Sequence, residues 1–283
     1  MTTGIRGATA ALLGLVACVL VPLAVVSVWF GQQITDTDGY VDAVAPLADN
    51  PVVREAATDQ VENAVNSKFR VSEANQPIVH VAVGLAIDGP EFPPVWRTAN
   101  RTAHERLMAI LEDRSGRDEV SIDLRPVAQQ VVAGLGRTGA VKTDGVRVPP
   151  IPVTLARTEQ LEQAQAGYQR MEPVRPWVPI ACVALLVLTL VIARSRLRAG
   201  AWLGFGSALA LGLTWLGLIV ARREAITRIP SGDDALAGEV WDALTKSLHG
   251  TMLNLIVAGL VVGVALLLVD RLGLLRGRRA DPA

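Results

Sequence analysis

Four long apolar stretches constrain the fold of this chain more than any other feature of its sequence. Each holds 17 to 23 residues without an internal charge, and they are residues 8–30, 177–193, 199–221 and 252–269. At a rise of about 1.5 Å per residue, a helix of this length crosses a hydrocarbon layer roughly 30 Å thick. The sequence therefore predicts four transmembrane helices.

The first stretch has two alternative interpretations. A cleaved signal peptide would end in small residues of the A-x-A type, and this stretch ends without them, so we expect it to be retained as a helix. Residues 15–18, Leu-Val-Ala-Cys, resemble a bacterial lipoprotein cleavage box, after which Cys18 would be lipidated. The twelve residues after Cys18 stay apolar, which favours the helix over lipidation.

The distribution of arginine predicts how the chain is oriented. With the N-terminus inside, the cytoplasmic segments are residues 1–7, 194–198 and 270–283. These 26 residues contain eight Arg, whereas the outer segments, 31–176 and 222–251, contain 19 Lys plus Arg in 176 residues. The positive-inside rule therefore places both termini in the cytoplasm and the large segment outside it, in a multi-pass protein of the cell membrane. Arg222 and Arg223 run against this pattern without reversing it.

The formal net charge of zero conceals a difference between the parts of the chain. Residues 31–176 contain 20 Asp plus Glu and 15 Lys plus Arg, a net charge of −5. This balance argues against a nucleic-acid partner, which requires a basic surface. The two cysteines, Cys18 and Cys182, both lie in apolar stretches, so we expect the outer domain to fold on its own core without disulfides.

The outer domain reads as mostly helical. Apolar periodicity and proline positions predict helices near residues 37–48, 51–69, 77–87 and 93–112. Thr37 or Asp38 is the expected N-cap of the first, and Asn50 followed by Pro51 is a strong start signal for the second. The third segment is rich in β-branched residues and could also be a strand, but its helical neighbours favour a helix.

After these helices the pattern changes. Alternation at residues 120–124 and 151–155 predicts a small two-stranded ribbon, with a helix at 125–135 between the strands. The polar run 158–171 predicts a helical stalk leading to the second apolar stretch. In the second outer segment, an amphipathic helix is expected between residues 231 and 248, before the fourth span, packed under the large domain and not on the lipid surface. The predicted fold class is thus mainly α, a four-helix transmembrane bundle with a mostly helical extracytoplasmic domain.

Small residues recur along two of the apolar stretches at four-residue intervals, which lets helix backbones approach closely. They are Gly200, Gly204, Ala208, Gly212, Gly259 and Gly263. Such a stripe serves either homodimerisation or packing within one bundle. We expect the second, because glycine is common in membrane helices generally.

Residues with catalytic or ligand-binding chemistry are few. Trp96, Asn100 and His104 are spaced to share one helical face, with Arg101 beside them, and this set could line a ligand pocket. A buried hydrogen-bond cluster that ties the helix to a neighbour is the stronger interpretation. The sequence contains no phosphate-binding loop, nucleophile elbow or metal-ligand spacing, so no catalytic, cofactor or metal site is predicted.

Three stretches carry a resemblance to a known family. They are Asp36 to Val53 (DTDGYV…APLADNPVV), Trp96 to His104 and Val240 to Thr245 (VWDALT). In these segments, and over nearly its whole length, the chain resembles a family of uncharacterised actinobacterial integral membrane proteins with four helices and a large extracytoplasmic domain. The resemblance implies location and architecture, and it supplies no catalytic residue.

Two functions follow as hypotheses. The first is a non-enzymatic envelope protein, a sensor, scaffold or interaction protein, whose extracytoplasmic domain binds an envelope partner or a second copy of the chain. The second is a permease-like subunit of a mechanotransmission-type ABC transport system, which has a similar order of spans. The short cytoplasmic segments leave little for an ATPase to contact, so the first is favoured. The spans have no ionisable residue in their interiors, which argues against transport by this chain alone.

Overall fold

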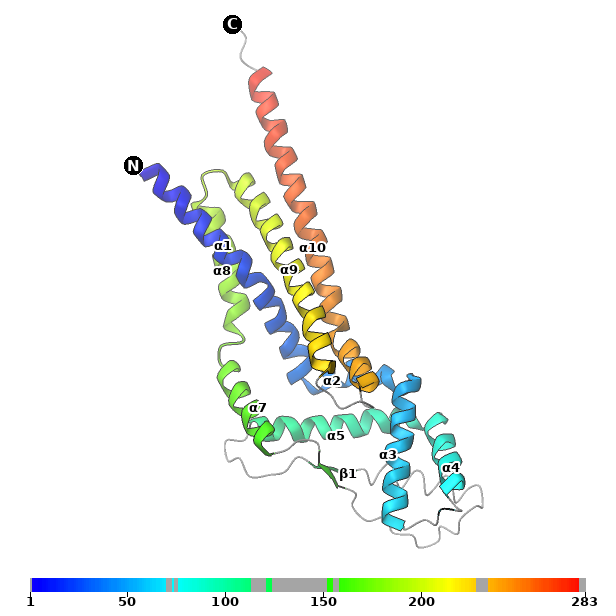
Figure 1. The fold of residues 1–283 in the computed structure, drawn as a ribbon. Helices are drawn as coiled ribbons and strands as arrows, with labels where there is room; N and C mark the ends of the chain where they lie inside the picture. The colour runs from blue at the N-terminus through cyan, green and yellow to red at the C-terminus, as the bar shows by residue number, and fades with distance from the viewer. Residues whose placement is uncertain are drawn as a thin grey trace. The chain divides into compact units, whose positions relative to one another are not determined.

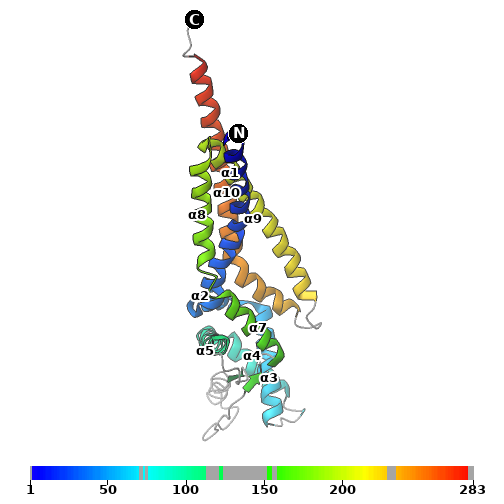
Figure 2. The same cartoon turned by 90° about the vertical axis from the view of Figure 1, so that its left-hand side faces the viewer.

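The computed structural model describes most of the chain and divides it into two compact units. The described residues are 2–69, 73, 76–112, 121–123, 152–154, 158–227 and 234–279. The first unit comprises Met1–Gly31, Met171–Arg228 and Thr245–Ala283, and the second comprises Gln32–Arg170 and Ile229–Leu244. The described residues are almost entirely helical apart from one short ribbon, which agrees with the predicted mainly α class (Figures 1 and 2).

Long apolar helices build the first unit. They are α1 (Thr2–Trp29), α8 (Trp177–Ile192), α9 (Arg196–Thr227) and the greater part of α10 (Asp234–Arg279). Helical segments at Gly7–Thr35, Arg196–Thr227 and Asp234–Gly273 are long and apolar enough to cross a membrane, and they contain three of the four predicted spans. The predicted span at 177–193 lies in α8, which has only 16 residues.

The four helices of the first unit alternate in direction. A Cβ atom added at Gly14 of α1 would lie 3.4 Å from Cγ2 of Thr189 on α8 and 3.5 Å from Cδ2 of Leu203 on α9. The start of α1 therefore faces the end of α8 and the start of α9. A Cβ at Gly200 would lie 2.8 Å from Leu266, which pairs the start of α9 with the later part of α10. The beginning of α1, the α8–α9 turn and the end of α10 therefore lie at one end of the unit (Figure 1).

The outward surface of this bundle is apolar. Large side chains such as Leu12, Trp202, Leu209 and Val261 are each at least 60 % exposed. An apolar surface of this extent is unfavourable in water and is the surface that lipid covers in a membrane protein.

The second unit begins at Gln32, inside the helical segment that directly follows α1. The chain continues from α1 into a π-helix, Phe30–Thr35, and then into α2, Thr37–Val44. The N-cap of α2 is Asp36, whose carboxylate accepts a hydrogen bond from the Gly39 N–H at 2.8 Å. The expected caps, Thr37 and Asp38, are therefore wrong by one or two residues, because Asp36 is the residue in the extended conformation that capping requires.

The predicted helix at 37–48 also changes type before its end. Residues Ala45–Asp49 form a 3₁₀ helix, η2, closed by the Asn50 N–H bonding to the Leu47 carbonyl at 3.0 Å. Pro46 explains the change, because it has no N–H to continue the α-helical ladder and is tolerated only in a first turn.

Three helices complete the framework of the second unit. They are α3 (Pro51–Phe69), α4 (Gln76–Asp88) and α5 (Phe92–Glu112), as predicted, including a helix in the ambiguous segment 77–87. Asn50 is confirmed as the cap of α3, since its Oδ1 accepts hydrogen bonds from the N–H groups of Val52 at 2.9 Å and Val53 at 3.4 Å.

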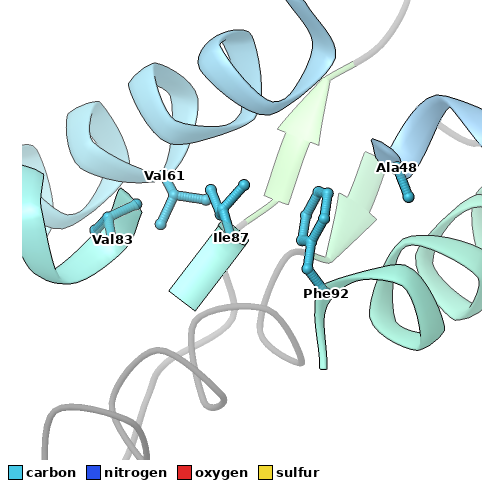
Figure 3. Packing of buried hydrophobic residues seen from close by; sticks show 5 residues of the cluster. All are labelled: Ala48, Val61, Val83, Ile87 and Phe92. Carbon is cyan, nitrogen blue, oxygen red and sulfur yellow. The ribbon is translucent and has the colours of Figure 1, made fainter. Parts of the chain in front are cut away.

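One apolar core joins these helices. Its buried members come from η2, α3, α4 and the start of α5, and Figure 3 shows them: Ala48, Val61, Val83, Ile87 and Phe92. Residues from distant parts of the sequence meet here, so the core holds the segments in one compact arrangement.

The remaining elements of the second unit follow α5. Strands β1 (Ser121–Asp123) and β2 (Pro152–Thr154) pair antiparallel, with Ile122 opposite Val153, at the positions predicted for the ribbon. Helix α7 (Thr158–Met171) corresponds to the predicted stalk. The helix predicted at 125–135 lies outside the described residues.

Helix α10 corrects the prediction for the second outer segment. An amphipathic helix was expected to precede a separate span, but Asp234–Arg279 is one helix of 46 residues. Residues 234–248 and 252–269 lie in this one helix because the segment between them contains no proline to interrupt it. Leu236, Val240, Ala243 and Leu244 pack against the buried residues Val44, Leu47 and Val53, so packing on the domain is confirmed for this part of the helix.

Candidate functional site

The predicted polar face of α5 holds α5 to other elements of the second unit. Trp96 Nε1 donates a hydrogen bond to the Val44 carbonyl at the end of α2, at 2.9 Å. Its ring packs near Phe92, with ring centroids 6.0 Å apart. Asn100 Nδ2 donates to the Trp96 carbonyl within the same helix, at 2.9 Å. Trp96 thus ties the start of α5 to the end of α2, whereas the bond of Asn100 lies within α5.

His104 is the buried centre of this face, with only 5 % of its surface exposed. Its Nε2 lies 3.0 Å from the Ile34 carbonyl, and its Nδ1 lies 3.1 Å from Thr37 Oγ1. A carbonyl oxygen only accepts, so Nε2 carries the hydrogen, and in the neutral ring Nδ1 accepts from the Thr37 hydroxyl. The Tyr40 ring stacks on the imidazole, with centroids 4.3 Å apart.

Arg101 closes the same face on its exposed side. Its Nη2 lies 2.6 Å from the Asp38 carboxylate on α2. Arg101 donates this hydrogen bond to the Asp38 carboxylate, and the bond raises the pKa of Arg101 above its ordinary value. Because both groups are well exposed, this ion pair contributes little to the free energy of unfolding and mainly orients the two side chains.

The structure therefore brings Trp96, Asn100, Arg101 and His104 together, and all four bond to backbone or side chains of the second unit. Both ring nitrogens of His104 have protein partners, so the ring has no nitrogen left to contact a ligand in this arrangement. The contacts support the structural interpretation of the cluster over a ligand pocket.

Two residues of this cluster were not found from the sequence. Thr37 and Tyr40 lie on α2, more than 60 positions before His104, and no periodicity relates the two helices. Burial raises the pKa of Tyr40, which reflects how closely its ring is packed at this junction.

A second polar link joins the two chain segments of the second unit. Asn50 Nδ2 donates to Glu239 Oε2 on α10 at 2.8 Å, while Asn50 Oδ1 caps α3. Arg54, one turn into α3, bonds to the Ala48 carbonyl at 2.7 Å and to Asp49 at 3.0 Å. These side chains anchor the start of α3 to η2 and to residues 234–244 of α10.

The predicted glycine stripes form a contact between α9 and α10 in the same chain. A Cβ at Gly204 would lie 2.6 Å from the Gly259 carbonyl oxygen and 3.3 Å from the Gly263 nitrogen. Ala208 lies 3.6 Å from a Cβ added at Gly259, and Gly200 faces Leu266. At Gly212, in contrast, an added Cβ meets nothing within 4 Å. All but Gly212 of the predicted packing residues are therefore used within one chain.

Among the described residues, no group of three or more His, Cys, Asp and Glu side chains is placed to hold a metal ion. Comparison with known proteins adds no assignment: no family model, curated protein or solved structure matches the chain.

Proposed function

We propose that four helices of the first unit cross the membrane, with α8 as the shortest span. Although α8 has 16 residues, the charge-free segment around it runs from 176 to 193, between Arg175 and Arg194. These 18 positions reach the lower limit for a span, and the exposed Arg194 after α8 can extend its guanidinium group to the headgroups. The contacts of α8 with α1 and α9 are those of a bundle member.

We propose further that the arginine-rich end of the bundle faces the cytoplasm and that the second unit is extracytoplasmic. The alternation of helix direction supports this orientation, since it gathers the start of α1, the α8–α9 turn and the end of α10 at one end. Taken together, the proposed cytoplasmic segments 1–7, 194–198 and 270–283 hold eight Arg in 26 residues, against 19 Lys plus Arg in the 176 residues of the proposed outer segments.

The proposed function is that of a non-enzymatic envelope sensor, scaffold or interaction protein that acts through its extracytoplasmic domain. The observation that carries it is α10, whose residues belong to both units without a helix break. Residues 234–244 pack on Val44, Leu47 and Val53, and the same helix continues into the bundle. A partner that shifts the packing of α2 and α3 would therefore act directly on a membrane helix.

The experiment is affinity purification of the tagged full chain from native membranes in mild detergent, with the stoichiometry of every co-purifying protein measured. The matched variant carries one alanine inserted after Thr245, which rotates the two parts of α10 by about 100°. Envelope partners that bind both forms, with a downstream response only in the native chain, would support a sensor. Equal responses would support a scaffold.

A stoichiometric cytoplasmic ATPase would contradict this proposal. It would favour the alternative, a permease-like subunit of a mechanotransmission-type ABC system, in which α10 would carry movement in the opposite direction.

A further inference from the structure

Arginines gather where α8 connects to α9. Helix α8 ends at Ile192 and α9 begins at Arg196, so Arg194 lies in the turn, while Arg196 and Arg198 lie in the first turn of α9. All three side chains belong to exposed residues.

In the described part of the chain, only part of this positive charge has an acidic partner. Asp270 on α10 is the one acidic residue among the described residues at this end of the bundle, and its carboxylate accepts a hydrogen bond from Arg198 Nε at 2.9 Å. Arg194, Arg196 and the exposed Arg271 remain in excess over acidic groups in the described part of this end.

A tryptophan follows the arginines on α9, at the start of its apolar surface. Trp202 is 75 % exposed, the largest exposed fraction among the large apolar residues of the described chain. It lies four residues after Arg198 on α9, which is about 6 Å along the helix axis. Indole rings favour the boundary between headgroups and acyl chains, whereas guanidinium groups bind phosphate at the level above it.

We propose that Arg194 and Arg196 bind the phosphate groups of anionic phospholipids, with Trp202 packed on the glycerol and upper acyl region of lipids in the same leaflet. The arginines supply bidentate donors for phosphate, and an indole in an apolar helix face is matched by a lipid and not by a soluble anion. The inference goes beyond the proposed function, because it holds for whichever leaflet this end of the bundle occupies.

The test measures which lipids surround Trp202. The full chain is reconstituted in vesicles containing equal fractions of brominated phosphatidylglycerol or brominated phosphatidylcholine, and tryptophan quenching is compared. The Trp202→Phe variant identifies the contribution of Trp202 to the total emission. We expect stronger quenching by the anionic lipid, with a preference that falls by up to about fivefold for each arginine removed in Arg194→Gln and Arg196→Gln.

Matched controls separate the arginine site from general charge effects. Arg223→Gln removes the same charge from the opposite end of α9 and should leave the preference of Trp202 unchanged. Arg196→Lys keeps the charge but not the bidentate donors, so it should retain only part of the preference. Equal quenching by both lipids, or a preference that survives the double Gln variant, would overturn the proposal. If millimolar inorganic phosphate abolished the preference for the anionic lipid, the arginines would form a general phosphate site, and the proposal of a phospholipid site would be overturned.

Discussion

At the scale of single residues, His104 is the side chain whose loss should cost most in the second unit. It bonds to the Ile34 carbonyl and to Thr37 and stacks on Tyr40 while almost fully buried. Replacing it by alanine leaves a buried carbonyl without its donor and opens a cavity, so we expect a loss of about 2–3 kcal/mol in unfolding free energy.

The measurement is the thermal unfolding of the full chain in detergent, followed by circular dichroism. His80→Ala is the matched control, because His80 is exposed and pairs with Glu62 at the surface, and its loss should cost less than about 1 kcal/mol. Equal effects of the two substitutions would contradict a structural role for His104.

Asn50 combines two roles that substitutions can separate. Asn50→Ala removes the cap of α3 and the bond to Glu239, and we expect a loss of about 1–2 kcal/mol. Asn50→Asp keeps the cap but places a carboxylate against that of Glu239. We therefore expect Asn50→Asp to lower the melting temperature and Glu239→Gln to restore it in the double variant, as a double-mutant cycle would show. Additive effects would exclude the direct contact.

The buried Tyr40 should make the free energy of unfolding depend on pH in the alkaline range. Burial raises its pKa above the ordinary value of 10.0, so the folded chain holds the phenolic proton after the unfolded chain has released it. The contribution of Tyr40 to the free energy of unfolding is therefore fully present below about pH 10, and it is lost as the pH rises through the higher pKa of the folded state. Absorbance titration of phenolate in the Tyr168→Phe variant, which leaves Tyr40 as the only tyrosine, should give a midpoint above the ordinary value, and that late component should disappear in Tyr40→Phe.

At the scale of elements, the contact between α9 and α10 depends on the absence of side chains. A Cβ at Gly204 would meet the backbone of Gly259 and Gly263, which can move only if the helices separate. We expect Gly204→Ala to cost about 1–3 kcal/mol, seen as a lower melting temperature in detergent. Gly212→Ala on the same helix has open space and should be neutral; equal losses from both would show that α9 and α10 do not pack as described.

The elements also show how far local sequence signals reach. Asn50-Pro51 predicted the start of α3 to the residue, because an N-cap and a first-turn proline act within three positions. The cap of α2 and the 3₁₀ segment at Ala45–Asp49 were missed, because three neighbouring residues could all cap and only the backbone conformation selects Asp36.

At the scale of the whole molecule, the proposed orientation predicts which residues are accessible from outside the cell. The native cysteines, Cys18 and Cys182, are free and buried in the first unit. In a variant without them, Asp59→Cys on α3 should react with a membrane-impermeant maleimide on intact cells. Leu272→Cys, near the end of α10, should react only after permeabilisation. The reverse pattern would overturn the orientation.

Charge, apolar length and capping are local properties, so the amino-acid sequence is enough to predict the apolar helices, the clustering of arginine in a few short segments and most helices of the second unit. Tertiary structure decided what joins them: the His104 cluster with Tyr40, the Asn50–Glu239 link and the meeting of Gly204 with Gly259. It also decided that α10 is one helix. Such contacts unite residues tens to hundreds of positions apart, and their partners are selected by the packing of whole helices, which no local pattern records.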